Sequence, residues 1–105
     1  MNYEKCLERA KKIAQELELL VEDEERLRSY FDDALDIEYR IGGGCEYRSV
    51  AITITSGGPH IEIDTGDRAV KIWWNDEKAQ WSINVETVDV IDAIFSSYYE
   101  ECIRK

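Results

Sequence analysis

Residues 50–55 read Val-Ala-Ile-Thr-Ile-Thr, in which large apolar side chains alternate with small or polar ones. Because successive side chains of a strand point to opposite faces, this period of two predicts a strand with one buried face. The strand is expected over residues 48–55, and the same pattern recurs over residues 37–41, 60–64, 69–74 and 80–85. The short connections contain Gly, Pro, Asn or Asp and require antiparallel hairpins. The sequence therefore predicts an antiparallel meander of four to five strands.

Apolar residues recur at helical spacing on both sides of this strand region. From Leu7 to Leu35 they predict one long amphipathic helix or two helices in series. A single helix would be about 50 Å long at 1.5 Å per residue, so a break is expected near Glu22–Glu25, with Asp23 able to cap a second helix. Thr87 is expected to cap a C-terminal helix. Its expected buried stripe consists of Val90, Ile91, Ile94, Phe95, Tyr98 and Cys102.

The apolar face of such a sheet needs cover, and the terminal helices are the cover that the sequence offers. This predicts an α+β two-layer sandwich over residues 1–105, as one domain flanked by N-terminal and C-terminal helices. Ile52, Ile72 and Ile83 are expected in the core. The other sheet face is expected to carry Glu62, Asp64, Lys71, Trp73 and Ser82, and Tyr47 is expected to point away from the core as Trp73 does.

No group of residues has the spacing of a catalytic, cofactor or metal site. His60 is the sole histidine, and no cysteine stands near it in a nucleophile pattern. Asp64 to Asp67 does not match a calcium loop, and the glycines at 42–44 lack the lysine of a phosphate loop. Cys6, Cys45 and Cys102 are widely spaced and are expected to be reduced thiols within the packing. The sequence therefore predicts a binding protein without a catalytic site, metal or cofactor.

Charge narrows the choice of partner. The chain has 23 acidic and 13 basic residues, a net charge of −10. Nucleic acid and anionic membranes repel such a chain, whereas a basic protein surface attracts it. The chain shows neither a membrane-spanning run nor a secretory signal, so a cytoplasmic location is expected. Monomer and homodimer both remain open.

The acids are concentrated in one stretch. Residues 16–38 hold ten acids and two bases. Regularly spaced carboxylates can occupy a groove whose Lys and Arg normally bind phosphates, which is nucleic-acid mimicry. Trp73 on the open sheet face is a second candidate contact, because Trp often anchors interfaces. The predicted partner-binding residues are Glu22, Asp23, Glu24, Glu25, Asp32, Asp33, Asp36, Glu38 and Trp73.

In size, net negative charge, the acidic run 22–25 and the helix-sheet-helix order, the chain resembles the small acidic anti-CRISPR proteins of phages and mobile elements. This resemblance implies an inhibitor that blocks the DNA-binding surface of a CRISPR nuclease in the host cytosol. Two alternatives remain open. One is an immunity protein against a basic nuclease toxin, and the other is a small acidic secretion chaperone or adaptor.

Overall fold

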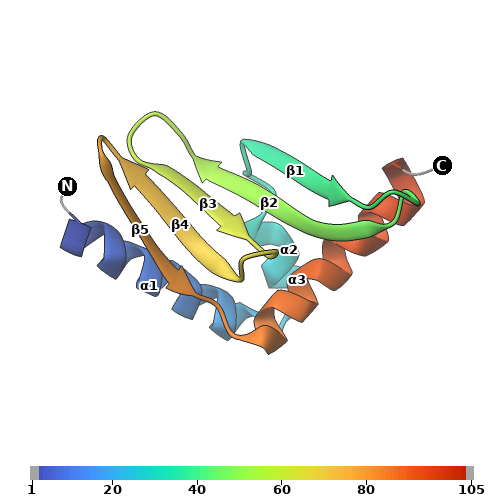
Figure 1. Ribbon diagram of the computed structural model, residues 1–105. Helices are drawn as coiled ribbons and strands as arrows, with labels where there is room; N and C mark the ends of the chain where they lie inside the picture. The colour runs from blue at the N-terminus through green and yellow to red at the C-terminus, as the bar shows by residue number, and fades with distance from the viewer. Residues whose placement is uncertain (1–2, 104–105) are drawn as a thin grey trace.

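The computed structural model describes residues 3–103 and contains two layers, a sheet and a set of helices (Figure 1). The elements in chain order are α1 (Tyr3–Leu20), α2 (Glu24–Tyr30), β1 (Asp36–Ile41), β2 (Tyr47–Thr55), β3 (His60–Asp64), β4 (Ala69–Trp74), β5 (Glu77–Ser82), α3 (Val85–Tyr98) and the short π-helix η1 (Tyr99–Ile103). The predicted α+β fold with N-terminal and C-terminal helices is confirmed.

The sheet is an antiparallel meander in which the strands lie in chain order, β1-β2-β3-β4-β5. Its helices cover one face: α1 packs on β4 and β5, and α3 packs on β2 (Figure 1). Ile52 pairs with Ile63 across β2 and β3, and Ile61 pairs with Ile72 across β3 and β4. These cross-strand pairs form the apolar face that the helices bury. We call the opposite face the open face.

The hydrophobic core lies between this apolar face and the helices. The predicted core residues Ile52, Ile72 and Ile83 are all buried. From α1 the core takes one stripe at helical spacing, consisting of Cys6, Ala10, Ile13, Ala14 and Leu17. Cys6 is therefore part of the packing as expected, whereas Cys45 and Cys102 are exposed. All three cysteines are free thiols.

The N-terminal helical region divides where the sequence predicted. Helix α1 ends at Leu20, and Asp23 caps α2 by accepting a hydrogen bond from the Arg26 N–H at 3.2 Å. The prediction of helix as far as Leu35 was wrong beyond Tyr30. Helix α2 ends at Tyr30, and Leu35 is exposed.

The fifth strand was predicted too late in the chain. It spans Glu77–Ser82 rather than residues 80–85, because the β4–β5 turn is tight. The inward position falls on Ala79, and Trp81 at the sheet edge is exposed. Ile83 lies beyond the strand, where its N–H donates to the Arg68 carbonyl at 2.8 Å. Val85, predicted in the strand, is the first residue of α3.

Helix α3 differs from the expectation at both ends. Asn84, not Thr87, is the N-cap, and its side chain accepts from the Thr87 N–H at 2.8 Å. Thr87 is buried within the first turn. At the other end the π-helix η1 shifts the buried face by one residue, so that Tyr99 is buried while Tyr98 and Cys102 are exposed.

Tyr47 was predicted to point away from the core, and this was wrong. Its ring packs with the rings of Tyr39 and Tyr99, at centroid distances of 6.3 Å from each, while those two rings are 5.8 Å apart. Its hydroxyl donates to Asp92 Oδ1 on α3 at 2.6 Å. The alternation of inward and outward side chains along β2 changes at this point, because a bulge interrupts the β1–β2 pairing next to Arg40 and Ile41.

Candidate protein-binding site

The eight predicted acids lie on one continuous segment formed by the end of the α1–α2 connection, α2, the following turn and the start of β1. We call residues 22–38 the acidic segment. Every one of its eight carboxylates is exposed. Two of them form ion pairs within the segment: Asp23 with Arg26 at 3.6 Å, and Glu24 with Arg28 at 3.5 Å. Within the part of the chain that the structure describes, the other six form no ion pair.

These acids do not follow a single helical flank. Unbroken helical spacing would align Glu22, Glu25, Asp32 and Asp36, but α2 spans only Glu24–Tyr30. Asp32 therefore lies in the turn after the helix, and Asp36 begins β1. The eight acids are therefore distributed over a connection, a helix, a turn and a strand, and do not form one straight helical row.

Trp73 lies apart from the acidic segment. It occupies the open face of β4, with β2 and β3 between it and β1. The His60 ring meets it edge-on at 5.2 Å between centroids, and Lys78 Nζ lies 5.4 Å from its ring centre. Trp73 is half-buried by these neighbours. The structure thus separates two predicted contacts, the acidic segment and Trp73.

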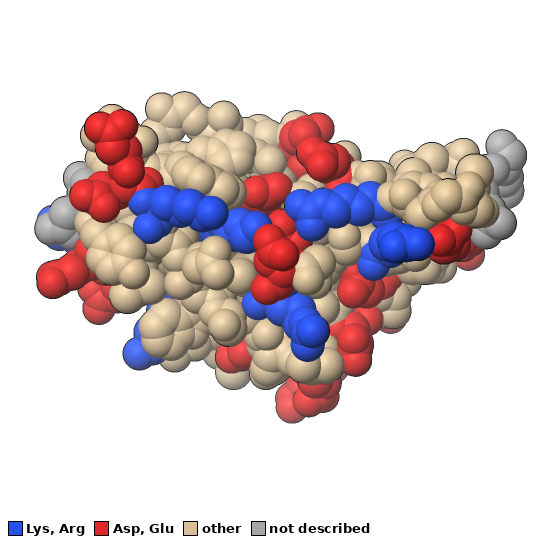
Figure 2. Space-filling model, viewed as in Figure 1, with Lys and Arg blue, Asp and Glu red and all other residues tan. Residues whose placement is uncertain are grey.

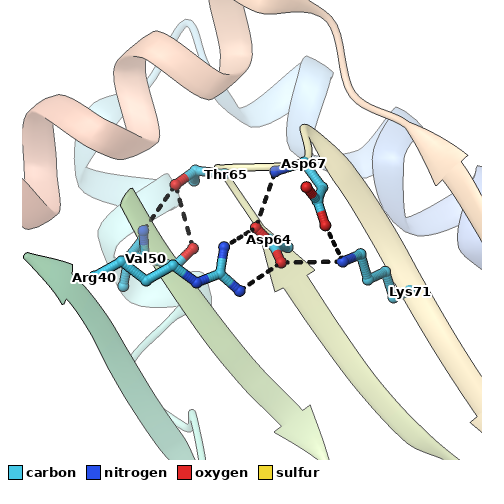
Figure 3. A network of polar contacts seen from close by, with 6 residues as sticks. All are labelled: Arg40, Val50, Asp64, Thr65, Asp67 and Lys71. Atoms are coloured by element: carbon cyan, nitrogen blue, oxygen red, sulfur yellow. Dashed lines mark hydrogen bonds and ion pairs between the residues drawn. The ribbon is translucent and has the colours of Figure 1, made fainter. Parts of the chain in front are cut away.

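The centre of the open face holds a carboxylate that the sequence did not single out as buried. Asp64 at the end of β3 is 0% exposed, and Arg40 Nη1 and Nη2 donate to its two oxygens at 2.8 Å each (Figure 3). Lys71 Nζ donates to Asp64 Oδ2 at 3.1 Å and also to Asp67, while the Asp67 N–H donates to Asp64 Oδ1 at 3.0 Å. We call Arg40, Asp64, Asp67 and Lys71 the polar network.

The polar network fixes the ionisation of its members. Burial acts to raise the pKa of Asp64, but the hydrogen bonds from Arg40, the Asp67 N–H and Lys71 outweigh it, and the pKa lies well below its ordinary value. The hydrogen bond to Asp67 raises the pKa of Lys71. Asp64 is therefore a structural counter-ion of two cations, not a carboxylate available as a proton acceptor.

A turn beside the network is fixed by a side chain. Thr65 Oγ1 accepts from the Val50 N–H at 2.9 Å and donates to the Val50 carbonyl at 3.2 Å (Figure 3). Thr65 is buried, and its own N–H also donates to the Val50 carbonyl. These bonds hold the β3–β4 turn against β2. They therefore keep Asp64 within hydrogen-bond distance of Arg40.

The open face is not uniformly acidic. Figure 2 shows Lys and Arg side chains in a row across it, with acids between them. Arg40 and Lys71 belong to the polar network, and Lys78 lies against Trp73. The excess negative charge is therefore carried largely by other surfaces, the acidic segment among them.

Beside the acidic segment lies an apolar hollow that sequence reasoning missed. It encloses about 230 Å³ between α2, β1 and α3. Its apolar lining consists of Phe31, Ile37, Tyr39, Ile94, Phe95 and Tyr98. The charged residues Arg28 and Asp32 also line it. The hollow forms beside Ile37, which is exposed because β1 is an edge strand. The sequence alone did not show that β1 would be at the edge, so it gave no signal for the hollow.

The residues considered for catalysis are distributed over separate elements. His60 starts β3, Cys45 lies in the β1–β2 turn, Cys6 is in α1 and Cys102 is in η1. Within residues 3–103 there is no group of three or more His, Cys, Asp or Glu side chains placed to hold a metal ion. No helix in that range has the length and apolar character needed to cross a bilayer.

No family model, curated protein or solved structure matches this chain.

Proposed function

We propose that this protein acts by binding and inhibiting a protein whose basic surface normally holds nucleic acid, and that the acidic segment is the contact. The observation that carries this proposal is that all eight carboxylates are exposed and six of them form no ion pair in the described part of the chain. A CRISPR nuclease is the partner class that the resemblance to anti-CRISPR proteins implies. Such nucleases hold nucleic acid in positively charged channels.

The physical basis is electrostatic. Like charges crowded into 17 residues repel one another, and a net charge of −10 already opposes compaction. Exposed carboxylates of this kind contribute little to folding. They do create a local field that speeds encounter with a basic surface and disfavours acidic ones. The arrangement therefore suits a partner whose Lys and Arg otherwise neutralise phosphates.

We further propose that the protein has no catalytic activity of its own. Asp64 is held between two cations, and the His60 ring packs against Trp73. The expected result is that His60→Ala and Cys45→Ser variants inhibit as the wild type does. Loss of inhibition in a folded His60→Ala variant would contradict this part of the proposal.

The test of the proposed inhibition uses cleavage of target DNA by a panel of purified CRISPR nucleases. Wild-type protein is expected to block cleavage when added before DNA and to fail when added afterwards, because the two compete for one surface. Binding is measured at low and moderate salt. Absence of binding to every nuclease tested would remove this partner class.

The acidic segment is tested by a triple variant, Glu22→Gln, Glu25→Gln and Asp33→Asn. It is expected to keep its stability, to associate more slowly and to show a weaker salt dependence. The matched control neutralises three exposed acids elsewhere: Asp76→Asn, Glu77→Gln and Glu101→Gln. Equal effects of both triple variants would show that net charge, and not the acidic segment, governs binding.

The second candidate function is that of a small acidic secretion chaperone or adaptor. The observation that favours it is the exposed apolar hollow between α2, β1 and α3, because a chaperone of this kind covers an apolar segment of its client. The discriminating measurement compares Tyr98→Ser with the acidic triple variant. Loss of partner binding in Tyr98→Ser, with binding kept in the acidic triple variant, would favour the chaperone function over mimicry.

A further inference from the structure

The outer edge of β1 has the properties of a pairing surface. The sheet order places β1 at one edge, so its outward backbone N–H and C=O groups face away from β2. Natural edge strands are commonly protected by proline, lysine or short length. The sequence of β1, Asp-Ile-Glu-Tyr-Arg-Ile, has neither proline nor lysine and runs for six residues. Its charged residues Asp36, Glu38 and Arg40 restrict pairing to a strand whose charges are complementary.

The side chains beside this edge are apolar and exposed on the helix side of the sheet. Ile37 and Ile41 on β1 are 38% and 46% exposed, and Tyr98 on α3 is 53% exposed. Leu35, just before β1, is also exposed. Of these residues, Ile37 and Tyr98 line the apolar hollow, so a strand added next to β1 would cover apolar surface as well as backbone.

One residue that lines the hollow has a polar atom without a partner. The hydroxyl of Tyr39 is buried and has no hydrogen-bond partner within the described residues. A buried polar group without a partner destabilises the protein.

The opposite edge differs. The outward strand β5 carries Glu77, Lys78 and Gln80, and its exposed Trp81 is covered by Lys11, whose Nζ lies 5.2 Å from the ring centre. Charge does not distinguish the two edges, since β1 itself carries Asp36, Glu38 and Arg40, but a covered edge resists pairing. The asymmetry between the two edges makes β1 the pairing edge of this sheet.

We propose that the occupant is a second copy of this chain, paired antiparallel through β1 about a two-fold axis at Tyr39. In this register the residues directly opposite one another are Tyr39 with Tyr39, Glu38 with Arg40, and Ile37 with Ile41. Each Glu38 then faces the Arg40 of the second copy on the open side, and the isoleucines meet on the helix side. Cross-strand pairs of opposite charge and of apolar residues both stabilise a sheet.

The registers centred on Ile37, Glu38 and Arg40 each set like charges opposite one another. A two-fold axis at Glu38 would set Glu38 opposite Glu38 between two Asp36–Arg40 pairs, and an axis at Arg40 would set Arg40 opposite Arg40. An axis at Ile37 would set Asp36 opposite Glu38. Like charges directly opposite one another destabilise a strand pair. Arg40 remains able to meet the second copy, because its side chain is still 40% exposed while it binds Asp64.

The resulting dimer has a continuous sheet of ten strands, twice the five of each copy. Because the pairing is antiparallel, Asp36 of each copy lies at the opposite end of the strand pair from Asp36 of the other. The two acidic segments then lie at separate positions on one particle. The proposal does not depend on the proposed function, since its evidence comes from β1 and the hollow.

The first experiment measures the mass of the full chain by sedimentation equilibrium over a wide concentration range. The expected result is a shift from 12.2 kDa to twice that value as concentration rises. Glu38→Lys, which places a cation opposite Arg40 of the second copy, is expected to weaken the dimer by about tenfold or more. The matched control Glu77→Lys makes the same charge change on β5 and is expected to leave the dimer intact.

Amide hydrogen exchange locates the interface without any substitution. Protection in β1 is expected to increase with protein concentration, while protection in β5 stays constant. A wild-type protein that remains at 12.2 kDa throughout would overturn the proposal and leave the β1 edge to a strand of a different protein. A dimer that survives Glu38→Lys but is lost in Glu77→Lys, or protection that rises in β5 alone, would also overturn it.

Discussion

Arg40 on β1 and Asp64 on β3 are joined by two hydrogen bonds of 2.8 Å, although β2 lies between their strands. The guanidinium reaches across β2 because the residues below it are small. Ala51 is the β2 partner of Asp64, and a Cβ added at Gly66 would lie 2.7 Å from Arg40 Nη1. This pair ties an edge strand to the centre of the sheet.

The first prediction concerns Asp64→Asn. The change leaves Arg40 and Lys71 without their shared counter-ion, so it is expected to destabilise the protein, near the lower end of about 3–5 kcal/mol because both cations remain partly accessible to water. Urea unfolding followed by circular dichroism measures this. Glu62→Gln on the same strand is the control and is expected to change stability much less. Equal stability of Asp64→Asn and wild type would contradict a structural role.

The second prediction concerns pH. The pKa of Asp64 is lower in the folded protein than in the unfolded chain, so its ionised form stabilises the fold. The contribution is complete above the unfolded pKa of about 3.9 and is lost as the pH falls below it toward the folded value. The expected result is a steeper loss of stability below about pH 4 in wild type than in Asp64→Asn. Parallel curves for the two proteins would refute this assignment.

The third prediction concerns the core. Ile52→Ala and Ile72→Ala remove buried side chains from the sheet, and each is expected to destabilise the protein by about 2–5 kcal/mol. Ile83→Ala is expected in the same range, although Ile83 lies outside β5. The exposed Leu19→Ala on α1 serves as control and is expected to stay within about 0.5 kcal/mol. Unchanged unfolding midpoints in the isoleucine variants would reject this core.

The fourth prediction separates Asn84 from Thr87 at the start of α3. Asn84→Ala removes the cap to the Thr87 N–H and is expected to destabilise the protein by about 0.5–2 kcal/mol. Thr87→Val removes a buried hydroxyl that has no hydrogen-bond partner in residues 3–103, so it is expected to be neutral or stabilising. Thermal unfolding of the two variants compares them. The reverse order of effects would show that Thr87 is the cap.

The sequence by itself determined the fold class and most of the elements. The period of two in residues 50–55 and the helical stripe of α1 follow from local side-chain geometry, so β2 and α1 were predictable. The break before α2 was predictable for the same reason, because Asp23 caps a helix through a contact with the nearby Arg26 N–H. The crowding of acids in residues 22–38 was also visible directly.

Only the tertiary structure decided which of these residues meet. Asp64 has the sequence context of a solvated turn, yet it is buried because Arg40 reaches it from a strand 24 residues earlier. Tyr47 turns inward at the β1–β2 bulge, and there its hydroxyl donates a hydrogen bond to Asp92, 45 residues away. The apolar hollow likewise exists because α2, β1 and α3 converge around the edge strand. These contacts join residues far apart in the chain, and local periodicity carries no information about such pairs.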